Sequence, residues 1–196
     1  MTPGQHFIVG WVVANAKPLD RRSRIVITAM GLLPDIDGFG YPIDKLGPYL
    51  GYSTSLFEEY HHFLCHNIFF GIAGSLVLAR LCRERLAVFL LCLAAFHLHL
   101  LGDLAGSRGP DGYQWPIPYL YPLIPSFELT WAGQWELNSW RNSAIGAVFF
   151  FAALWIARYR HVTFFELFSL RFEMKVREAA RRRGYFKSGT VADVAR

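Results

Sequence analysis

His61-His62-Phe63-Leu64-Cys65-His66-Asn67 opens directly onto an apolar run that continues to residue 81. The stretch holds three of the chain's seven histidines within six residues. Two further polar clusters flank it: Leu33-Pro34-Asp35-Ile36-Asp37 before it, and His97-Leu98-His99-Leu100-Leu101-Gly102-Asp103 after it. Imidazoles and carboxylates are costly to bury beside hydrocarbon unless something binds them. A shared metal site is the simplest common explanation for the three clusters.

The composition is typical of a membrane protein. Hydrophobic residues make up 53% of the 196 residues and aromatic residues 16%, while only 18% are charged. Soluble domains have about 25% charged residues. The formal net charge of +5 is concentrated in short clusters and in the C-terminal tail. Because a nucleic-acid binder would spread basic residues over a folded face, we interpret the excess as a topology signal and expect no nucleic-acid partner.

The apolar segments predict an all-α integral membrane helical bundle. Three strong runs predict transmembrane helices: residues 67–81, 86–101 and 143–156. Two shorter N-terminal runs, 6–16 and 25–33, fall short of the ~20 residues that a span needs and predict tilted or half-inserted helices. Residues 1–170 are expected to form a membrane-embedded domain with the metal site. Residues 171–196 form a basic tail with the pattern of an amphipathic surface helix.

The basic clusters predict the topology. They are a loop at 17–24, a turn at 80–85 and the segment 158–187. If all three lie on the cytoplasmic side, the chain must cross back between them, and every candidate ligand falls at the opposite face together with the 104–140 loop. The sequence therefore predicts a multi-pass protein of the inner (cytoplasmic) membrane, with its metal site on the non-cytoplasmic side.

Spacing limits which ligands can converge. On a helix, His99 and Asp103 are four apart and share one face, as His62 and His66 would. His97 and His99 cannot both point the same way, and His61 can meet His66 only if a turn or a helix start lies between them. The predicted metal ligands are His6, Asp35, Asp37, His61, His66, His99 and Asp103.

Neutral imidazoles and carboxylates suit zinc, and also manganese or iron. Because there are more than four candidates, we expect one to three divalent ions, with zinc preferred. A carboxylate that the metal does not fully engage, Asp35 or Asp37, is the predicted catalytic base. The residues expected to support the site or to hold an anionic substrate are His62, His97, Arg108 and Arg141.

Structural explanations stay open for several of these residues. The Leu-Pro-Asp-Ile-Asp stretch also fits a helix stop with Asx turns. His62 also fits a histidine at the lipid interface, and His97 a packed histidine that binds nothing.

The same motifs carry a resemblance to a family. The chain resembles the membrane-bound metal-dependent hydrolases of the DUF457/YdjM-like group. Their pattern is an N-terminal His, then Gly-x-Leu-Pro-Asp-x-Asp, His-Arg-x-x-x-His-Ser and His-x-x-x-Asp. His6 and the stretches 31–37, 61–67 and 99–103 match in this order, and Trp115-Pro116 follows them. The resemblance covers about residues 1–120.

Two positions depart from the family pattern. His62 stands where the pattern has Arg, and Asn67 where it has Ser, so either can alter substrate contacts or add a ligand. The order of motifs is also similar, more loosely, to zinc-dependent phospholipase C and P1 nuclease, which implies phosphoester chemistry.

Together these observations predict a zinc-type hydrolase that uses a metal-activated water. A site at headgroup level implies membrane lipid as partner and a lipid or lipid-linked phosphoester as substrate. The competing class is a non-catalytic, metal-stabilised membrane scaffold or a metal-ion transporter. A transporter brings polar ligands to mid-span, whereas here they lie at the ends of apolar runs, which favours hydrolysis. Binding of a partner by the basic tail is compatible with either class.

Overall fold

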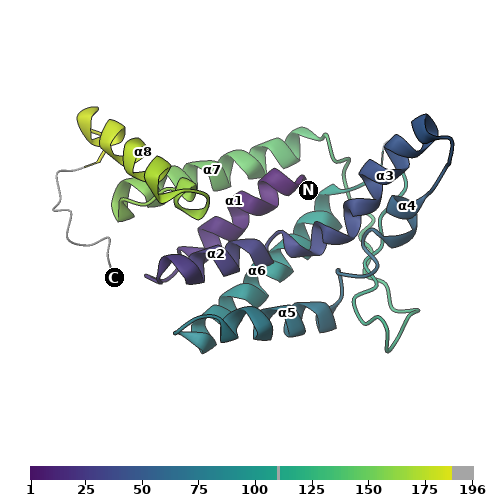
Figure 1. The fold of residues 1–196 in the computed structure, drawn as a ribbon. Helices are drawn as coiled ribbons and strands as arrows, with labels where there is room; N and C mark the ends of the chain where they lie inside the picture. The colour runs from purple at the N-terminus through teal and green to yellow at the C-terminus, as the bar shows by residue number, and fades with distance from the viewer. Residues whose placement is uncertain (110, 187–196) are drawn as a thin grey trace.

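The computed structural model describes residues 1–109 and 111–186, and their regular structure is helical (Figure 1). This confirms the all-α prediction for the described residues. The α helices are α1 (Pro3–Ala14), α2 (Arg21–Met30), α3 (Gly40–Leu46), α4 (Leu56–Tyr60), α5 (Ile68–Arg80), α6 (Arg85–Gly106), α7 (Trp140–Arg160) and α8 (Leu170–Arg182). The 3-10 helices are η1 (Leu33–Phe39), η2 (Gly47–Leu50) and η3 (Phe164–Leu167).

Two helices are long and apolar enough to cross a membrane: α6, with 22 residues, and α7, with 21. The first of the three predicted spans forms α5, which has only 13 residues. At about 1.5 Å per residue it reaches about 20 Å, less than the roughly 30 Å of a hydrocarbon core. The structure therefore supports two candidate spans and does not confirm a third. Helices α1 and α2 are short, as predicted.

The predicted basic loop at 17–24 is partly helical, which corrects the prediction. The side chain of Asp20 accepts a hydrogen bond from Ser23 N at 2.7 Å and caps α2, so the helix begins at Arg21. An N-terminal carboxylate satisfies a free backbone N–H group of the first turn. This cap extends α2 by four residues before the apolar run that starts at residue 25.

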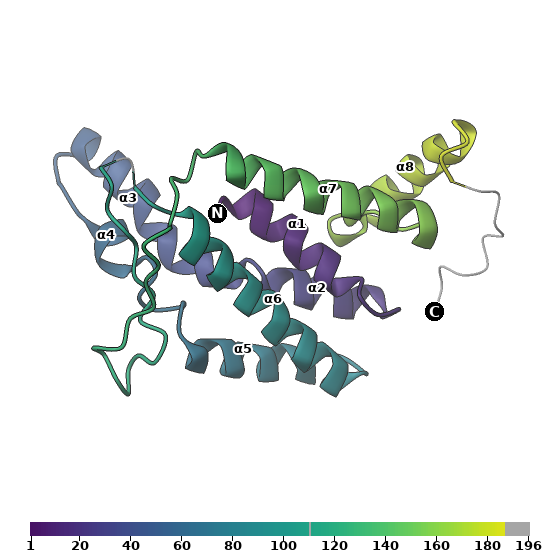
Figure 2. The same ribbon diagram turned by 180° about the vertical axis from the view of Figure 1, so that it is seen from behind.

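Helix α6 lies at the centre and packs against α5, α2 and α1, and α1 also packs against α7 (Figure 2). The core contains the fully buried side chains of Trp11, Ile27 and Phe96. A Cβ atom at Gly71 would lie 2.5 Å from the Phe96 ring. Glycine at this position therefore permits the close approach of α5 to α6.

The basic clusters meet at one end of the bundle. Lys17, after α1, pairs with Glu84, before α6, and Arg160, at the end of α7, donates to the carbonyl of Asn15 at 2.6 Å. The start of α1 and the end of α6, which carry metal-ligand candidates, lie at the other end, beside the start of α7. This separation agrees with the predicted topology, whereas the side of the membrane that each end faces stays a prediction.

The described part of the connection between α6 and α7 packs back onto α6. Asn142 is buried and donates to the carbonyls of Gly106 at 2.8 Å and Leu137 at 2.9 Å, while its Oδ1 accepts from Trp135 Nε1. This single side chain joins the start of α7 to the end of α6. Of the predicted basic tail, 171–196, residues 171–182 belong to α8, and residues 187–196 lie outside the described part of the chain.

We expect Asn142→Ala to lower the free energy of unfolding by about 1–3 kcal/mol, because the buried Gly106 carbonyl, the part-buried Leu137 carbonyl and an indole N–H lose their partner. Thermal unfolding of the detergent-solubilised protein measures the effect. Ser143→Ala, at the exposed neighbouring position, is the control and should leave the transition unchanged. Equal stability of both variants would contradict the role of Asn142.

Candidate metal centre

Asp35 and Asp37 lie on the short helix η1 and point in different directions. A 3-10 helix has three residues per turn, so side chains two positions apart do not share a face. Asp35 Oδ1 lies 3.6 Å from His99 Nε2 on α6. Asp37 instead faces the 61–67 loop. The two carboxylates, grouped together by sequence reasoning, therefore have different partners.

The 61–67 loop is a turn that gathers three imidazoles. His62 has a φ of 67°, a left-handed conformation that is uncommon for a residue with a side chain. Asn67 closes the loop by accepting from Phe70 N at 2.9 Å, which caps α5. The ring centroids of His61 and His66 lie 4.3 Å and 4.4 Å from that of His62. Strained backbone at a buried polar residue is frequent at functional sites.

Asp37 holds this loop in place. Its Oδ1 lies 3.0 Å from His61 Nδ1, and its Oδ2 lies 3.1 Å from His66 Nδ1 and accepts from Cys65 N at 3.0 Å. Burial raises the pKa of Asp37, but the hydrogen bonds from the two histidines outweigh it and lower the pKa below its usual value. The carboxylate is therefore ionised. A carboxylate on Nδ1 directs the Nε2 of His66 away from itself, as in many metal sites.

Helix α6 supplies the centre of the site through the predicted pair, His99 and Asp103. His99 Nδ1 donates to the carbonyl of Gly31 at 2.8 Å, which leaves Nε2 as the nitrogen that can bind a metal. That Nε2 lies 3.0 Å from Asp103 Oδ2 and 3.2 Å from His66 Nε2. His97 points elsewhere, to the Leu93 carbonyl and the Tyr119 hydroxyl.

Helix α1 adds His6, whose Nε2 lies 3.1 Å from Asp103 Oδ1. The His6 ring stacks on that of His99 with centroids 3.7 Å apart. A Cβ atom at Gly102 would lie 3.2 Å from His6 Cε1, so a glycine there admits the ring. Asp103 Oδ1 also accepts from Ser107 Oγ at 2.9 Å and contacts the α-amino group of Met1. This oxygen is therefore fully engaged.

Asp103 Oδ2 is buried and accepts no hydrogen bond, although three imidazole nitrogens face it. The Nε2 atoms of His99, His66 and His62 lie 3.0, 3.6 and 3.9 Å away. The second oxygen of Asp35 is likewise buried without a partner. Burying such groups unpaired is costly, and a cation among them would remove that cost.

The donor atoms fall into two groups that share Asp103, and within each group they all lie within 4.8 Å of one another. The groups are His6, Asp35, His99 and Asp103, and His62, His66 and Asp103. Imidazole nitrogens and carboxylate oxygens are ordinary zinc ligands. These residues therefore fit a divalent metal ion, whose identity the donor set does not fix.

The structure brings together five of the seven predicted ligands: His6, Asp35, His66, His99 and Asp103. It places Asp37 and His61 beside the groups rather than within them. The two oxygens of Asp37 contact the Nδ1 atoms of His61 and His66 instead of facing Asp103. His62, predicted to support the site, lies within a group. The signal for His62 was present in the sequence, as a histidine where the family pattern has arginine. The Gly31 carbonyl, which fixes the tautomer of His99, carried no sequence signal.

Arg108 and Arg141, predicted to hold an anion, line a common pocket of about 340 Å³. Arg108 lies 3.8 Å from Glu136, and the guanidinium of Arg141 lies over the Trp135 ring. Gln134 lines the same pocket and donates to the backbone carbonyl of Asp103 at 3.0 Å. Through Gln134, the lining of this pocket therefore contacts the backbone of α6 at Asp103, a residue of the His/Asp cluster.

A family model matches most of the chain. The model of the family described as YdjM inner membrane protein matches residues 1–164. No curated protein and no solved structure matches the chain. The looser similarity to phospholipase C and P1 nuclease therefore stays a prediction.

We expect His99→Ala to lose bound metal, because His99 contributes a donor next to the unpartnered oxygen of Asp103. His97→Ala removes an imidazole two residues away that faces Tyr119, and it should keep the metal. Asp37→Asn should weaken binding by about 10–100-fold without abolishing it, since Asp37 orients His66. Metal analysis of the purified variants tests all three. Equal metal content in His97→Ala and His99→Ala would show that the cluster is not the site.

Metal affinity should rise with pH. Burial lowers the pKa of His66, but the neighbouring carboxylates of Asp103 and Asp37 outweigh it and raise the pKa to about 9. Below that pH the metal must displace a proton, so we expect affinity to rise about tenfold per pH unit and to level off above about pH 9. Competition with a chelating dye measures this. Asp37→Asn should move the levelling-off to lower pH, and a flat profile in the wild type would contradict the prediction.

Proposed function

Because this chain belongs to the YdjM inner membrane protein family, we propose that its His/Asp cluster binds a catalytic divalent metal. The protein is then a metal-dependent hydrolase, acting on phosphoesters of membrane lipids or lipid-linked substrates. The observation that carries the proposal is Asp103 Oδ2, which is buried and unpartnered while the Nε2 atoms of three histidines face it. Zinc is the preferred ion, with one to three ions in the cluster.

A divalent ion held there would supply a Lewis acid and would lower the pKa of water enough to provide hydroxide near neutral pH. Asp35 is the better candidate for the base that accepts a proton. One of its oxygens has no hydrogen-bond partner, and 17% of its side chain is exposed. Both oxygens of Asp37 are taken by His61, His66 and Cys65 N, which favours a positioning role for Asp37.

The surface beside the site supports a lipid substrate. The segment from η1 through α4 leads into the histidine loop and exposes a group of large apolar and aromatic side chains. They include Phe39, Tyr41, Leu46, Tyr49, Leu50 and Tyr60, and Tyr49 is 87% exposed. Aromatic residues of this kind are enriched at the membrane–water interface. The pocket with Arg108 and Arg141 offers two guanidinium groups for a phosphate.

The burial of the cluster favours a second candidate function, a metal-stabilised membrane scaffold. His6, His62, His66, His99 and Asp103 are each at most 3% exposed. A structural metal site is closed, whereas a catalytic one keeps a position for substrate. In the scaffold, metal loading raises stability and no ester is cleaved.

We expect the metal-loaded full-length protein to release phosphate from phospholipids or polyprenyl phosphates in mixed micelles. Asp35→Asn should lower turnover by about 10²–10⁴-fold, as expected for loss of a general base. The His62, His66 and Asp103 group does not include Asp35, so the variant should retain bound metal. Asp111→Asn, an exposed loop carboxylate, is the control and should keep full activity. Loaded protein that is stabilised but inactive on every ester would support the scaffold instead.

A further inference from the structure

The two donor groups of the His/Asp cluster come from different parts of the fold. The donors of the first group lie on α1, η1 and α6, and they are His6, Asp35, His99 and Asp103. The second group joins two histidines of the 61–67 loop, His62 and His66, to the same Asp103. A tetrahedral ion takes four ligands, so a single ion cannot use all six residues.

The position of His62 is the one that a single ion in the first group leaves unexplained. The residue is only 3% exposed, and its φ of 67° is a left-handed conformation that favours glycine. Its Nε2 lies 3.9 Å from Asp103 Oδ2, too far for a hydrogen bond, and its Nδ1 is buried without a partner. Leaving a buried imidazole unpaired is costly. An ion between His62 and Asp103 would offset that cost.

The two groups differ in how strongly they can hold an ion. The first offers two carboxylates among its four donors, whereas the second offers one carboxylate, which it shares. His99 of the first group is oriented through Nδ1 by the Gly31 carbonyl, and His66 of the second by Asp37. His62 has no such partner on Nδ1. Because oriented imidazoles bind metal more tightly, the second group is expected to be the weaker site.

The number of donors also separates the roles of the two groups. Four protein donors fill the tetrahedral shell that zinc prefers, as in structural sites. Three protein donors leave one position open for water or substrate, as in catalytic sites. Centres with two ions are found in enzymes that cleave phosphoesters, where each ion stabilises one of the oxygens that exchange. The arrangement of donors therefore matches one structural and one open site.

We propose that the His/Asp cluster is a centre for two ions with Asp103 as their shared ligand. The four-donor group binds the first ion and joins α1, η1 and α6. His62, His66 and Asp103 bind the second ion more weakly and leave the open position for a phosphoryl oxygen or water. This inference rests on the proposed metal binding by the cluster. It adds the number of ions, the role of each group and a ligand function for His62.

Metal analysis of the full-length, detergent-purified protein after equilibration with Zn²⁺ counts the ions. We expect two ions per wild-type chain. His62→Gly removes the imidazole, and glycine adopts the left-handed backbone without strain, so this variant should fold and bind one ion. His62→Asn, which also tolerates this backbone, should likewise bind one. His97→Ala, the matched histidine control, should keep both.

A second measurement shows whether the two ions share a ligand. Two Mn²⁺ ions bridged by one carboxylate are magnetically coupled, so the electron paramagnetic resonance spectrum of the Mn²⁺-loaded wild type should differ from that of isolated Mn²⁺. His62→Gly should give the spectrum of isolated Mn²⁺. This readout does not depend on catalytic activity.

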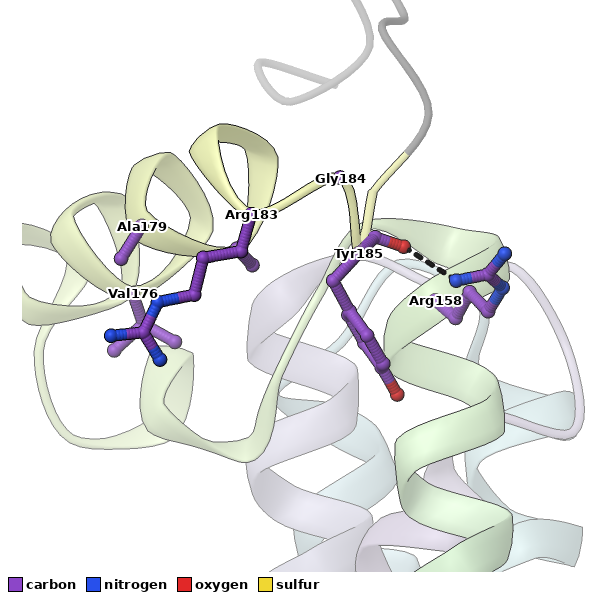
Figure 3. Close-up of a pocket in the computed structure, with 7 residues that line it drawn as sticks. Arg158, Val176, Ala179, Arg183, Gly184 and Tyr185 are labelled. Atoms are coloured by element: carbon purple, nitrogen blue, oxygen red, sulfur yellow. Dashed lines mark hydrogen bonds between the residues drawn. The ribbon is translucent and has the colours of Figure 1, made fainter.

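Arg158→Gln is the control for indirect effects on folding. Arg158 lines a pocket of about 570 Å³ between the end of α7 and α8, and it donates to the Tyr185 carbonyl at 2.9 Å (Figure 3). Among the described residues that line this pocket, none is a histidine, a cysteine or a carboxylate. The variant therefore alters packing without removing a metal donor, and it should keep both ions.

The possible results separate this inference from the proposed function. One ion per wild-type chain would overturn the two-ion centre and leave metal binding by the cluster intact, whereas no bound ion would overturn both. Two ions retained in both His62 variants, or two uncoupled Mn²⁺ ions in the wild type, would also overturn it. So would a loss in Arg158→Gln equal to that in His62→Gly, because the loss would then reflect folding.

Discussion

The carboxylate of Asp103 is the group on which the arrangement of the His/Asp cluster depends. One oxygen joins α1 to α6 through His6, and the other faces the histidines of α6 and of the 61–67 loop. Segments far apart in the chain therefore meet at a single buried anion. Because a buried carboxylate is unfavourable without compensation, the surrounding imidazoles, or a cation held between them, determine whether these segments stay together.

The bundle has two chemically distinct ends. Buried histidines and carboxylates gather where α1 begins and α6 ends, and the basic clusters gather at the other end, joined by the Lys17–Glu84 pair and the contacts of Arg160. The two candidate spans connect these ends. The candidate metal ligands and the basic clusters are therefore separated by the length of the bundle.

Burial sets the balance between the two functions that the cluster supports. Tight packing around His66, His99 and Asp103 strengthens electrostatic interactions, since water is excluded. The same packing limits the space for a substrate. Asp35 is the exception in its group, because it combines an unpartnered oxygen with partial exposure. Access to the site is therefore expected from the side of η1 and of the exposed aromatic residues that follow it.

The sequence alone determined the helical class, the pairing of His99 with Asp103 and the separation of basic residues from candidate metal ligands, because these follow from periodicity, i to i+4 spacing and charge distribution along the chain. Tertiary structure decided which groups face the cluster. It turned Asp37 toward His61 and His66, brought His62 inward through a left-handed backbone, and fixed His99 on the Gly31 carbonyl. It also ended α5 too early for a clear span. These outcomes depend on loop geometry and on contacts between distant segments, which local sequence patterns do not encode.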